Sequence, residues 1–268
     1  MTNPSPPNVS KWDDLTVRLA SSAGMVVVGA AAVIAGGIWF QMVVVFVAAV
    51  TIWELWMMIR PNAPTTGMLL AALAASVMSG QLADGTAWGW VLFLVVPILG
   101  ATQLKSEVKT FFVFALGVQI AGWGLVHFRL DYGFTWLLWL MCVVITTDIF
   151  GYFAGKAFGG PKFWPRISPK KTWSGTVAGW CGAGLVGALF AYFSAAGPAI
   201  IVISMLTSFA GQMGDIIESG LKRRMGVKDS STLIPGHGGL FDRFDALLGA
   251  ALFMLLVVDV FGVPGVAF

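Results

Sequence analysis

The chain has 268 residues, of which 57% are hydrophobic and only 11% are charged, and its formal net charge is +3. A soluble domain carries roughly 25% charged residues. The apolar residues here form long blocks, so the composition excludes an ordinary soluble domain and predicts a polytopic membrane protein. The small net charge gives no reason to expect a nucleic-acid partner.

Residues 1–14 lack a basic segment followed by an apolar stretch and a small-residue cleavage site. We therefore predict a short disordered lead-in and no removable signal peptide. Cys142 and Cys181 lie in apolar blocks without another Cys or His at ligand spacing. They are predicted to be buried small side chains that form no disulfide framework.

A helix needs about twenty apolar residues to cross the hydrocarbon layer. By that length the chain predicts an all-α integral membrane protein, a single domain over residues 1–268 with a bundle of about nine transmembrane helices. The fourth predicted span is short and is broken by Pro97. The spans are expected at Leu19–Trp39, Gln41–Ile59, Thr66–Leu82, Trp88–Gly100, Thr110–Phe128, Phe134–Phe150, Gly175–Ser194, Pro198–Gly214 and Ala246–Gly262.

The distribution of Lys and Arg predicts the orientation. With nine spans and a cytoplasmic N-terminus, fifteen of the sixteen basic residues fall on the cytoplasmic side and only Arg129 falls outside. The C-terminus is then outside, and eight or ten spans would fit if a short segment were re-entrant. Two polar segments, Gly151–Trp173 and Gly211–Asp245, share the cytoplasmic face in this topology and can meet there.

Acidic residues at membrane depth are costly, roughly 2.5–3.5 kcal/mol each on insertion scales, and by default indicate function. The candidates are Glu54, Asp148, Asp215, Glu218 and Asp259. Asp148 and Asp215 end predicted spans at the cytoplasmic interface, where the alternative is a structural pair with a neighbouring lysine. Glu54 is interpreted either as a functional acid or as a structural hydrogen-bonding group, and Asp259 as interfacial.

The segment Gly211–Asp245 concentrates groups suited to phosphate chemistry. If the eighth helix continues past Gly214, the residues Asp215, Glu218, Ser219 and Lys222 share one face. The run from Pro235 to Gly239 is too flexible for a helix interior and could present backbone amides to phosphate oxygens. Such a run lets a ligand approach the backbone closely.

Carboxylates at two helix ends suggest a metal site. Mg²⁺ is commonly held by one or two carboxylates together with substrate phosphates, and Asp215 and Asp242 supply such a pair. Zinc is not expected, because His127 falls on the outside and no cysteine lies near His237. His237 by itself is more typical of a loop histidine bonded to backbone.

The segment Gly151–Trp173 adds glycines and cations. Lys170 and Lys171 lie between Pro169 and Thr172, just before a span, where they could clamp a phosphate chain. Lys162 and Arg166 are equally well explained as topology signals. Together the two segments favour phosphoryl or nucleotidyl transfer, in which positioning and charge neutralisation do most of the catalysis. No Walker A pattern is present.

The polar segments also resemble a known family. The pattern Ser219-x-Leu-Lys222-Arg223, Lys228-Asp229 and His237-Gly-Gly-Leu-x-Asp242-Arg243-Phe-Asp245 is similar to the C-terminal signature of the phosphatidate cytidylyltransferases, also called CDP-diacylglycerol synthases. Asp148-x-x-x-Tyr152-x-x-Gly155-Lys156-x-x-Gly159 and Ile167-Ser-Pro-Lys-Lys-Thr172 resemble that family's preceding segments. The similarity covers Asp148 to Asp245, residues 148–245, which hold the expected catalytic loops.

The resemblance implies a homodimeric, multi-pass enzyme of the inner membrane, with its active site on the cytoplasmic face. It would make CDP-diacylglycerol and pyrophosphate from CTP and phosphatidic acid with Mg²⁺, and it leaves open whether a monovalent cation joins the Mg²⁺. Carried over by position, Asp215 and Asp242 are metal ligands. The other implied catalytic residues are Lys170, Lys171, Lys222 and Arg223, which would face the triphosphate or the lipid phosphate, and Asp148, Ser219, Lys228, His237, Arg243 and Asp245, which would line the polar cavity. Tyr152 would line the cavity as well, and the implied cofactor-binding residues are Tyr152, Lys156, Gly238 and Gly239.

One position departs from the family pattern. Ser174 stands where the family usually has a glutamate, so either that glutamate is dispensable or another acid, such as Glu54 or Glu218, takes its role. Two other functions are compatible with the sequence: a CTP-dependent kinase of a polyprenol or similar lipid alcohol, and a cation- or proton-coupled transporter that uses Asp148 and Asp215 as relays. Clustering of the acids at one face disfavours the transporter.

Overall fold

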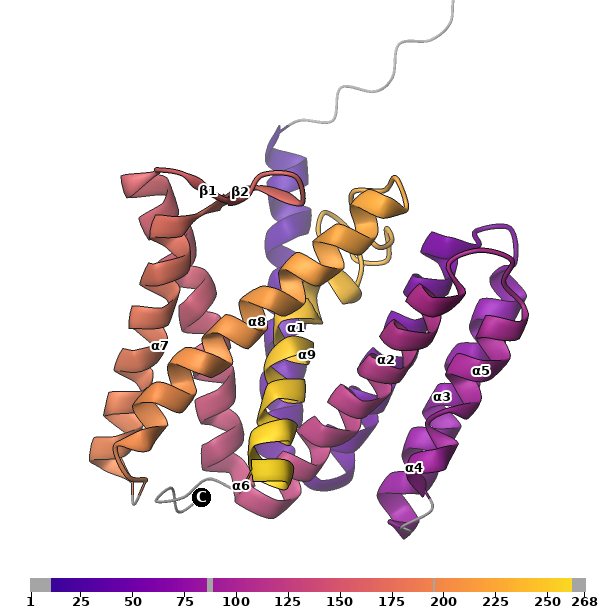
Figure 1. Ribbon diagram of the computed structural model, residues 1–268, viewed down its shortest axis with the longest axis horizontal. Coiled ribbons are helices and arrows are strands. Elements are labelled where there is room, and N and C mark those ends of the chain that lie inside the picture. Colours follow the sequence, from indigo (N-terminus) through magenta and orange to yellow (C-terminus); the bar gives the residue numbers. More distant parts are fainter. Residues whose placement is uncertain (1–10, 86–88, 195, 262–268) are drawn as a thin grey trace, which may run out of the picture.

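The computed structural model describes residues 11–85, 89–194 and 196–261, which form a helical bundle (Figure 1). Besides the helices there is one two-stranded antiparallel hairpin. The elements are α1 (Lys11–Ala35), α2 (Gly37–Ile59), α3 (Pro64–Asp84), α4 (Gly89–Leu92), α5 (Val95–Thr102), α6 (Val108–Phe158), β1 (Lys162–Trp164), β2 (Ser168–Thr172), α7 (Trp173–Phe193), α8 (Ala199–Arg224), α9 (Phe241–Leu255) and a π-helical turn (Leu256–Phe261).

Six helices within the described ranges are long and apolar enough to cross a membrane, and this confirms an all-α membrane protein. Residues 11–14, predicted as the end of a disordered lead-in, are helical because α1 begins at Lys11, and the rest of that predicted lead-in, residues 1–10, lies outside the described ranges. Helix α6 has 51 residues and contains both Thr110–Phe128 and Phe134–Phe150, which were predicted as separate spans. The chain turns between its two arms at Gly133, where φ is +85°. Figure 1 shows the arms diverging from that point.

The predicted span Trp88–Gly100 is interrupted, as its proline suggested. Helix α4 ends at Leu92 and α5 begins at Val95. Pro97 has no amide hydrogen to donate to the carbonyl four residues earlier, and its ring crowds that carbonyl. The carbonyl belongs to Phe93, and it accepts a hydrogen bond from the buried Gln119 side chain of α6 instead, at 3.2 Å.

Glycines allow the helices that carry the polar segments to pack closely. A Cβ at Gly214 of α8 would lie 2.4 Å from the backbone oxygen of Asp245 in α9. A Cβ at Gly175 of α7 would lie 2.5 Å from the backbone oxygen of Gly151 in α6. These backbones can touch only because no side chain separates them, so α8 is held against α9 and α7 against α6.

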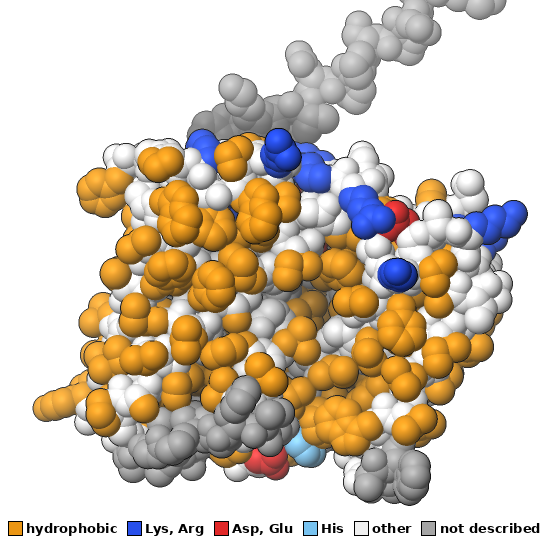
Figure 2. All heavy atoms as spheres, viewed as in Figure 1, with side chains coloured by type: hydrophobic (Ala, Val, Ile, Leu, Met, Phe, Trp, Pro, Cys, Tyr) orange, Lys and Arg blue, Asp and Glu red, His pale blue; other side chains and the backbone are white. Residues whose placement is uncertain are grey.

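The outer surface is mostly apolar, whereas Lys and Arg side chains gather along one edge (Figure 2). This edge is the end of the bundle that carries the β1–β2 hairpin and the C-terminal end of α8 (Figure 1). The prediction that both cysteines are buried is wrong for Cys181, which is exposed, while Cys142 is half-buried. In a membrane, lipid chains are as apolar as a protein core, so an apolar block does not tell which of its side chains face the protein.

Candidate active site

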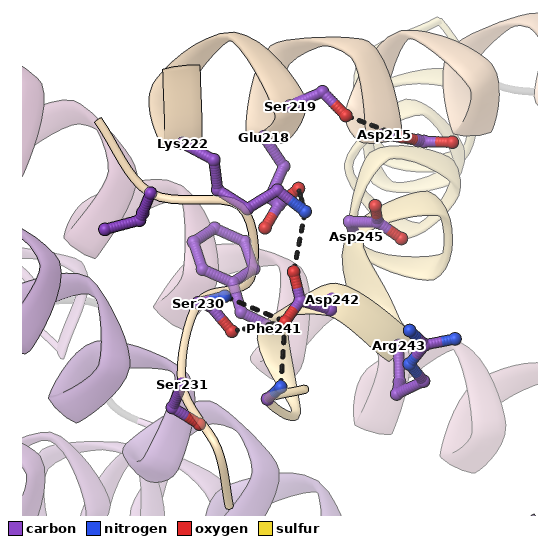
Figure 3. A network of polar contacts seen from close by, with 12 residues as sticks. Asp215, Glu218, Ser219, Lys222, Ser230, Ser231, Phe241, Asp242, Arg243 and Asp245 are labelled. Carbon is purple, nitrogen blue, oxygen red and sulfur yellow. Dashed lines mark hydrogen bonds and ion pairs between the residues drawn. The ribbon is translucent and has the colours of Figure 1, made fainter. Parts of the chain in front are cut away.

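The C-terminal half of α8 and the first turns of α9 carry seven of the sixteen predicted site residues (Figure 3). The Lys222 ammonium lies 2.6 Å from Glu218 Oε2 and 2.6 Å from Asp242 Oδ1. Glu218 and Lys222 are both buried. A buried carboxylate requires such a partner, so Lys222 joins the two helices by neutralising an acid on each.

Asp242 is fully engaged within the protein. Its Oδ2 accepts hydrogen bonds from the Ser230 amide at 2.8 Å, the Ser230 hydroxyl at 2.9 Å and the Gly239 amide at 2.8 Å. Burial by itself would raise the pKa of Asp242, but the bonds from Lys222, Gly239 and Ser230 outweigh it and lower the pKa. The ionised form is therefore the stable one, and Asp242 holds the loop to the start of α9.

Glu54 organises the same loop from a different helix. It is fully buried on α2, and it accepts hydrogen bonds from the Leu240 amide at 2.9 Å and the Phe241 amide at 2.7 Å. Hydroxyls of Ser230 and Ser231 donate to it at 3.2 and 2.6 Å. The interpretation of Glu54 as a structural hydrogen-bonding group is confirmed.

Ser174 is tied into a different part of the molecule. Its hydroxyl donates to the Gly159 carbonyl at 2.5 Å and lies 3.0 Å from the Thr172 hydroxyl. Both carboxylate oxygens of Glu54 accept hydrogen bonds from residues 230–241. Glu54 therefore does not take the place of the family's glutamate at position 174.

The two polar segments meet at Asp215, as the topology predicted. Lys171 of β2 forms an ion pair with Asp215 Oδ2 at 2.5 Å, and the Ser219 hydroxyl donates to Asp215 Oδ1 at 3.2 Å. The Asp215 carboxylate is also near enough to Asp148 of α6 and Asp245 of α9 to repel their carboxylates. Asp245 lies on the helix facing Asp215 (Figure 3), so carboxylates from three helices converge on one lysine.

A polar cleft of about 350 Å³ opens beside this ion pair. Its cations are Lys156, Lys170 and Lys171, and Asp148 and Tyr152 line it as well. The glycines of the α6–α7 crossing form part of the wall, so backbone is exposed to a ligand there. Gln212 of α8 also lines the cleft. Its side chain donates a hydrogen bond to the Thr176 carbonyl at 3.2 Å and accepts one from the Trp180 indole at 2.9 Å. The cleft has the cations and the close backbone approach that a polyphosphate requires.

The glycine run forms a tight turn in which Gly236 and Gly238 have φ of +75° and +81°. The Ile234 amide donates to the Gly238 carbonyl at 2.8 Å, and the Gly239 amide is used by Asp242. The Ile234 and Gly239 amides therefore bind acceptors within the protein and are not directed at a ligand phosphate. Arg243, which is exposed, donates a hydrogen bond to the His237 carbonyl at 2.8 Å.

His237 is held by α1 and not by the lysines and acids of the cleft. Its Nδ1 lies 2.9 Å from the Ser21 hydroxyl and its Nε2 lies 2.9 Å from the Ser22 hydroxyl. Ser21 also donates to the Pro235 carbonyl at 3.1 Å. A neutral imidazole with its proton on Nδ1 satisfies all three contacts, because Ser21 then accepts and Ser22 donates. Nothing in the sequence pattern of Ser21 and Ser22 predicted this role.

We expect the double variant Ser21→Ala, Ser22→Ala to release the turn at residues 234–239. Three hydrogen bonds to the turn, each worth about 1 kcal/mol, are lost, so amide hydrogen exchange in these residues should rise about a hundredfold. Ser76→Ala is the matched control, since its hydroxyl donates only to the Ala72 carbonyl within its own helix. Equal exchange in the two variants would show that α1 does not hold the turn.

Arg223 and Lys228 also lie apart from the cleft. Arg223 is exposed and donates a hydrogen bond to the carbonyl of Val227, four residues later, at 3.4 Å. Lys228 is exposed on the loop that follows α8. The neighbouring Arg224 pairs with Glu107 at the start of α6, at 2.8 Å. Arg223 and Lys228 therefore belong to the basic edge of the molecule in this conformation.

Close packing of α8 on α9 sets the spacing of Asp215 and Asp245, so we expect Gly214→Ala to disturb it. Its Cβ would lie 2.4 Å from the Asp245 backbone oxygen and 3.1 Å from Gly249 Cα, and overpacking of this kind costs about 1–3 kcal/mol. The midpoint of thermal unfolding in detergent should fall by several degrees. Gly24→Ala on α1 is the control, because a Cβ there meets nothing within 4 Å. An unchanged midpoint for Gly214→Ala would mean that the two helices can move apart at no cost.

A sequence model described as the cytidylyltransferase family matches residues 16–261. The chain belongs to this family. Among similar proteins named phosphatidate cytidylyltransferase, one from Brucella abortus is 43% identical over 159 residues, covering 57% of this chain and 59% of that protein. One from Rickettsia conorii is 30% identical over 210 residues, covering 72% of this chain and 91% of that protein.

A third relative of the same name, from Bacillus subtilis, is 36% identical over 182 residues and covers 63% of this chain. The chain spans about three fifths of the length of the Brucella relative that it matches. The family match includes α6, the hairpin, α8 and the start of α9. These are the elements that bring Asp148, Lys171, Asp215 and Asp245 together.

Proposed function

We propose that the chain transfers the cytidylyl group of CTP to phosphatidic acid, with CDP-diacylglycerol and pyrophosphate as products. The observation that carries the proposal is the Lys171–Asp215 ion pair, which joins two polar segments beside a cationic cleft in an otherwise apolar bundle. The names of the similar proteins point to the same reaction.

The proposed chemistry is a direct in-line displacement. A phosphate oxygen of phosphatidic acid attacks the α-phosphorus of CTP, a new oxygen–phosphorus bond forms, and the bond from the α-phosphorus to the bridging oxygen of pyrophosphate breaks. The attacking oxygen is already anionic, so neither a protein nucleophile nor a general base is required. Lys170, Lys171 and Lys156, which line the cleft, are proposed to hold the triphosphate and offset the charge that develops on it.

Mg²⁺ is the proposed cofactor, and the donor set at the site suits it. Of the two predicted ligands Asp215 fits better, because Asp242 is committed to Lys222, Ser230 and Gly239. Asp245 on the facing helix is the second carboxylate that we propose. Mg²⁺ bound there would neutralise phosphate charge beside the acids. Substrate phosphates are proposed to supply the remaining oxygen ligands.

We further propose nine spans, a cytoplasmic N-terminus, an outside C-terminus, an inner-membrane location with the cleft facing the cytoplasm, and a homodimer. The accumulation of Lys and Arg at the hairpin end of the bundle supports the orientation (Figure 2), because cytoplasmic loops carry the excess of basic residues. Cysteine accessibility to a membrane-impermeant reagent in intact cells, with single cysteines placed in the hairpin and near Arg129, tests it.

An assay with CTP labelled at either the α- or the γ-phosphorus tests the reaction. Purified protein, Mg²⁺ and phosphatidic acid should place the α label on the lipid and release the γ label in pyrophosphate. A lipid-alcohol kinase would place the γ label on its lipid and release CDP. Ion flux in proteoliposomes without CTP would favour a transporter. Absence of α label from the lipid would overturn the proposed function.

A further inference from the structure

Gln212 is a buried polar residue of α8, and both ends of its side-chain amide bond to one neighbouring helix. Its Nε2 donates to the Thr176 carbonyl at 3.2 Å, and its Oε1 accepts from the Trp180 indole at 2.9 Å. Thr176 and Trp180 both belong to α7 and lie one turn apart. The Gln212 side chain, which is almost fully buried, therefore joins α8 to α7 at two points.

The contact between α7 and α8 leaves room for this amide. A Cβ at Gly179 of α7 would lie 2.8 Å from Gln212 Nε2 and 3.2 Å from the Thr147 carbonyl of α6, so the amide uses space that a side chain at position 179 would fill. Thr147 in turn donates to the Ser208 hydroxyl, one turn earlier on α8, at 2.7 Å. These contacts fix the place of α8 against both α6 and α7.

The same contact lies on a short path to the Lys171–Asp215 ion pair. Asp215 follows Gln212 by three residues on α8, and Lys171 directly precedes Thr172, the residue that caps the N-terminus of α7. The connections form a closed ring, from Gln212 through Thr176 to the start of α7, across the ion pair at 2.5 Å and back along α8. A shift of α7 along α8 would therefore move Lys171 away from Asp215.

We propose that Gln212 is a positioning residue, which sets the register of α7 on α8 and thereby places Lys171 opposite Asp215. Its effect on turnover rests on the proposed function. Gln212 lines the polar cleft, but its amide is already bonded to α7 at both ends. It therefore acts through Lys171 and Asp215, and not by contact with a substrate.

Hydrogen bonds hold the register of two membrane helices better than apolar packing does. Lipid tails are as apolar as the side chains of a helix, so apolar contacts alone favour no single alignment. Two directional bonds to atoms one turn apart are satisfied in one alignment only, because a shift by one residue moves a helix by about 1.5 Å. Misplacement of a reacting group by about 1 Å can lower turnover about 10²-fold, so a lost register should reduce kcat.

A zero-length carbodiimide tests the placement without turnover. The reagent activates a carboxylate, a lysine amine in contact attacks it to form an amide, and the displaced oxygen leaves in the urea. Lys171 and Asp215 are 26% and 30% exposed, so the wild-type protein in nanodiscs should give a cross-linked 171–215 peptide. Gln212→Met keeps the length of the side chain and removes both hydrogen bonds. It should lower the yield about three- to sevenfold, since two interhelical bonds of average strength shift an alignment equilibrium by about sevenfold.

Gln119→Met is the matched control. Gln119 is also buried, and it donates from α6 to the Phe93 and Ala115 carbonyls at 3.2 and 3.1 Å, away from the lining of the cleft. This variant should lower the midpoint of thermal unfolding about as much as Gln212→Met and leave the cross-link unchanged. A wild-type yield in Gln212→Met would overturn the proposal. An equal loss in both variants would overturn it too, because the effect would then be general destabilisation.

Trp180→Phe covers the case in which Gln212→Met does not fold. It removes one of the two bonds and keeps an aromatic ring against Phe209. The yield of the 171–215 cross-link should fall about twofold, as the loss of one interhelical bond allows. A yield equal to that of the wild type in this folded variant would show that the bonds to α7 do not place Lys171.

The CTP assay then separates positioning from substrate contact. Gln212→Met should lower kcat about three- to sevenfold, in step with the cross-link, while the KM for CTP rises by less than kcat falls, because Lys156 and Lys170 still line the cleft. A raised KM at unchanged kcat would mean that Gln212 contacts substrate, and the proposal would fail. If the cross-link responds as expected but the wild type forms no CDP-diacylglycerol, the positioning role stands and the proposed reaction fails.

Discussion

Asp215→Asn is expected to lower kcat for CDP-diacylglycerol formation by a factor of about 10²–10³ or more, the loss that follows removal of a single group stabilising transition-state charge. The side chain keeps its shape, and Ser219 can still donate to it, but the ion pair with Lys171 at 2.5 Å loses its negative partner. Affinity for Mg²⁺ should fall as well. The measurement is initial rate against Mg²⁺ concentration with labelled CTP.

Asp131→Asn is the matched control for Asp215→Asn. It makes the same chemical change on an exposed residue next to Gly133, at the turn of α6, and it should retain normal turnover. Both variants should insert into the membrane and elute from size exclusion like the wild type. Near-normal activity of Asp215→Asn at every Mg²⁺ concentration would remove Asp215 from the reaction centre.

Glu54→Ala is expected to have the largest effect on stability. It leaves the amides of Leu240 and Phe241 and the Ser231 hydroxyl without their buried acceptor, whereas the Ser230 hydroxyl can still donate to Asp242. An unsatisfied buried donor costs about 1–3 kcal/mol, so the free energy of unfolding should fall by about 3 kcal/mol or more. Activity should be lost with it, since Asp242 and Asp245 follow directly on the released segment. Thermal unfolding in detergent, followed by tryptophan fluorescence, gives the shift.

Ser231→Ala calibrates the Glu54 result because it removes one of the four donors and leaves the carboxylate in place. It should cost about 1 kcal/mol. If Glu54→Ala were no more destabilising than Ser231→Ala, water would have to reach the buried carboxylate site, and Glu54 would not be the residue that positions the start of α9.

Much of the site could be predicted from the sequence. Ionisable residues rarely occur in apolar blocks unless they are paired or functional, so Asp148, Asp215 and Glu218 were identifiable by type and position alone. The asymmetry of Lys and Arg predicted that Gly151–Trp173 and Gly211–Asp245 share a face, and the Lys171–Asp215 pair confirms that they meet. Spacing along one helix also placed Glu218 and Lys222 together, four residues apart.

The sequence determined the hydrophobic blocks, the break at Pro97, the division between Thr110–Phe128 and Phe134–Phe150, and the types of charged residue at the site, because these follow from local chemistry and from the cost of burying charge. Only the tertiary structure decided the contacts between distant segments. Ser22 lies against His237, 215 positions later, and Glu54 binds the Phe241 amide across 187 positions. Such partners depend on which helix faces lie together, and in a membrane the apolar side chains do not reveal this, because lipid and protein core are equally good surroundings for them.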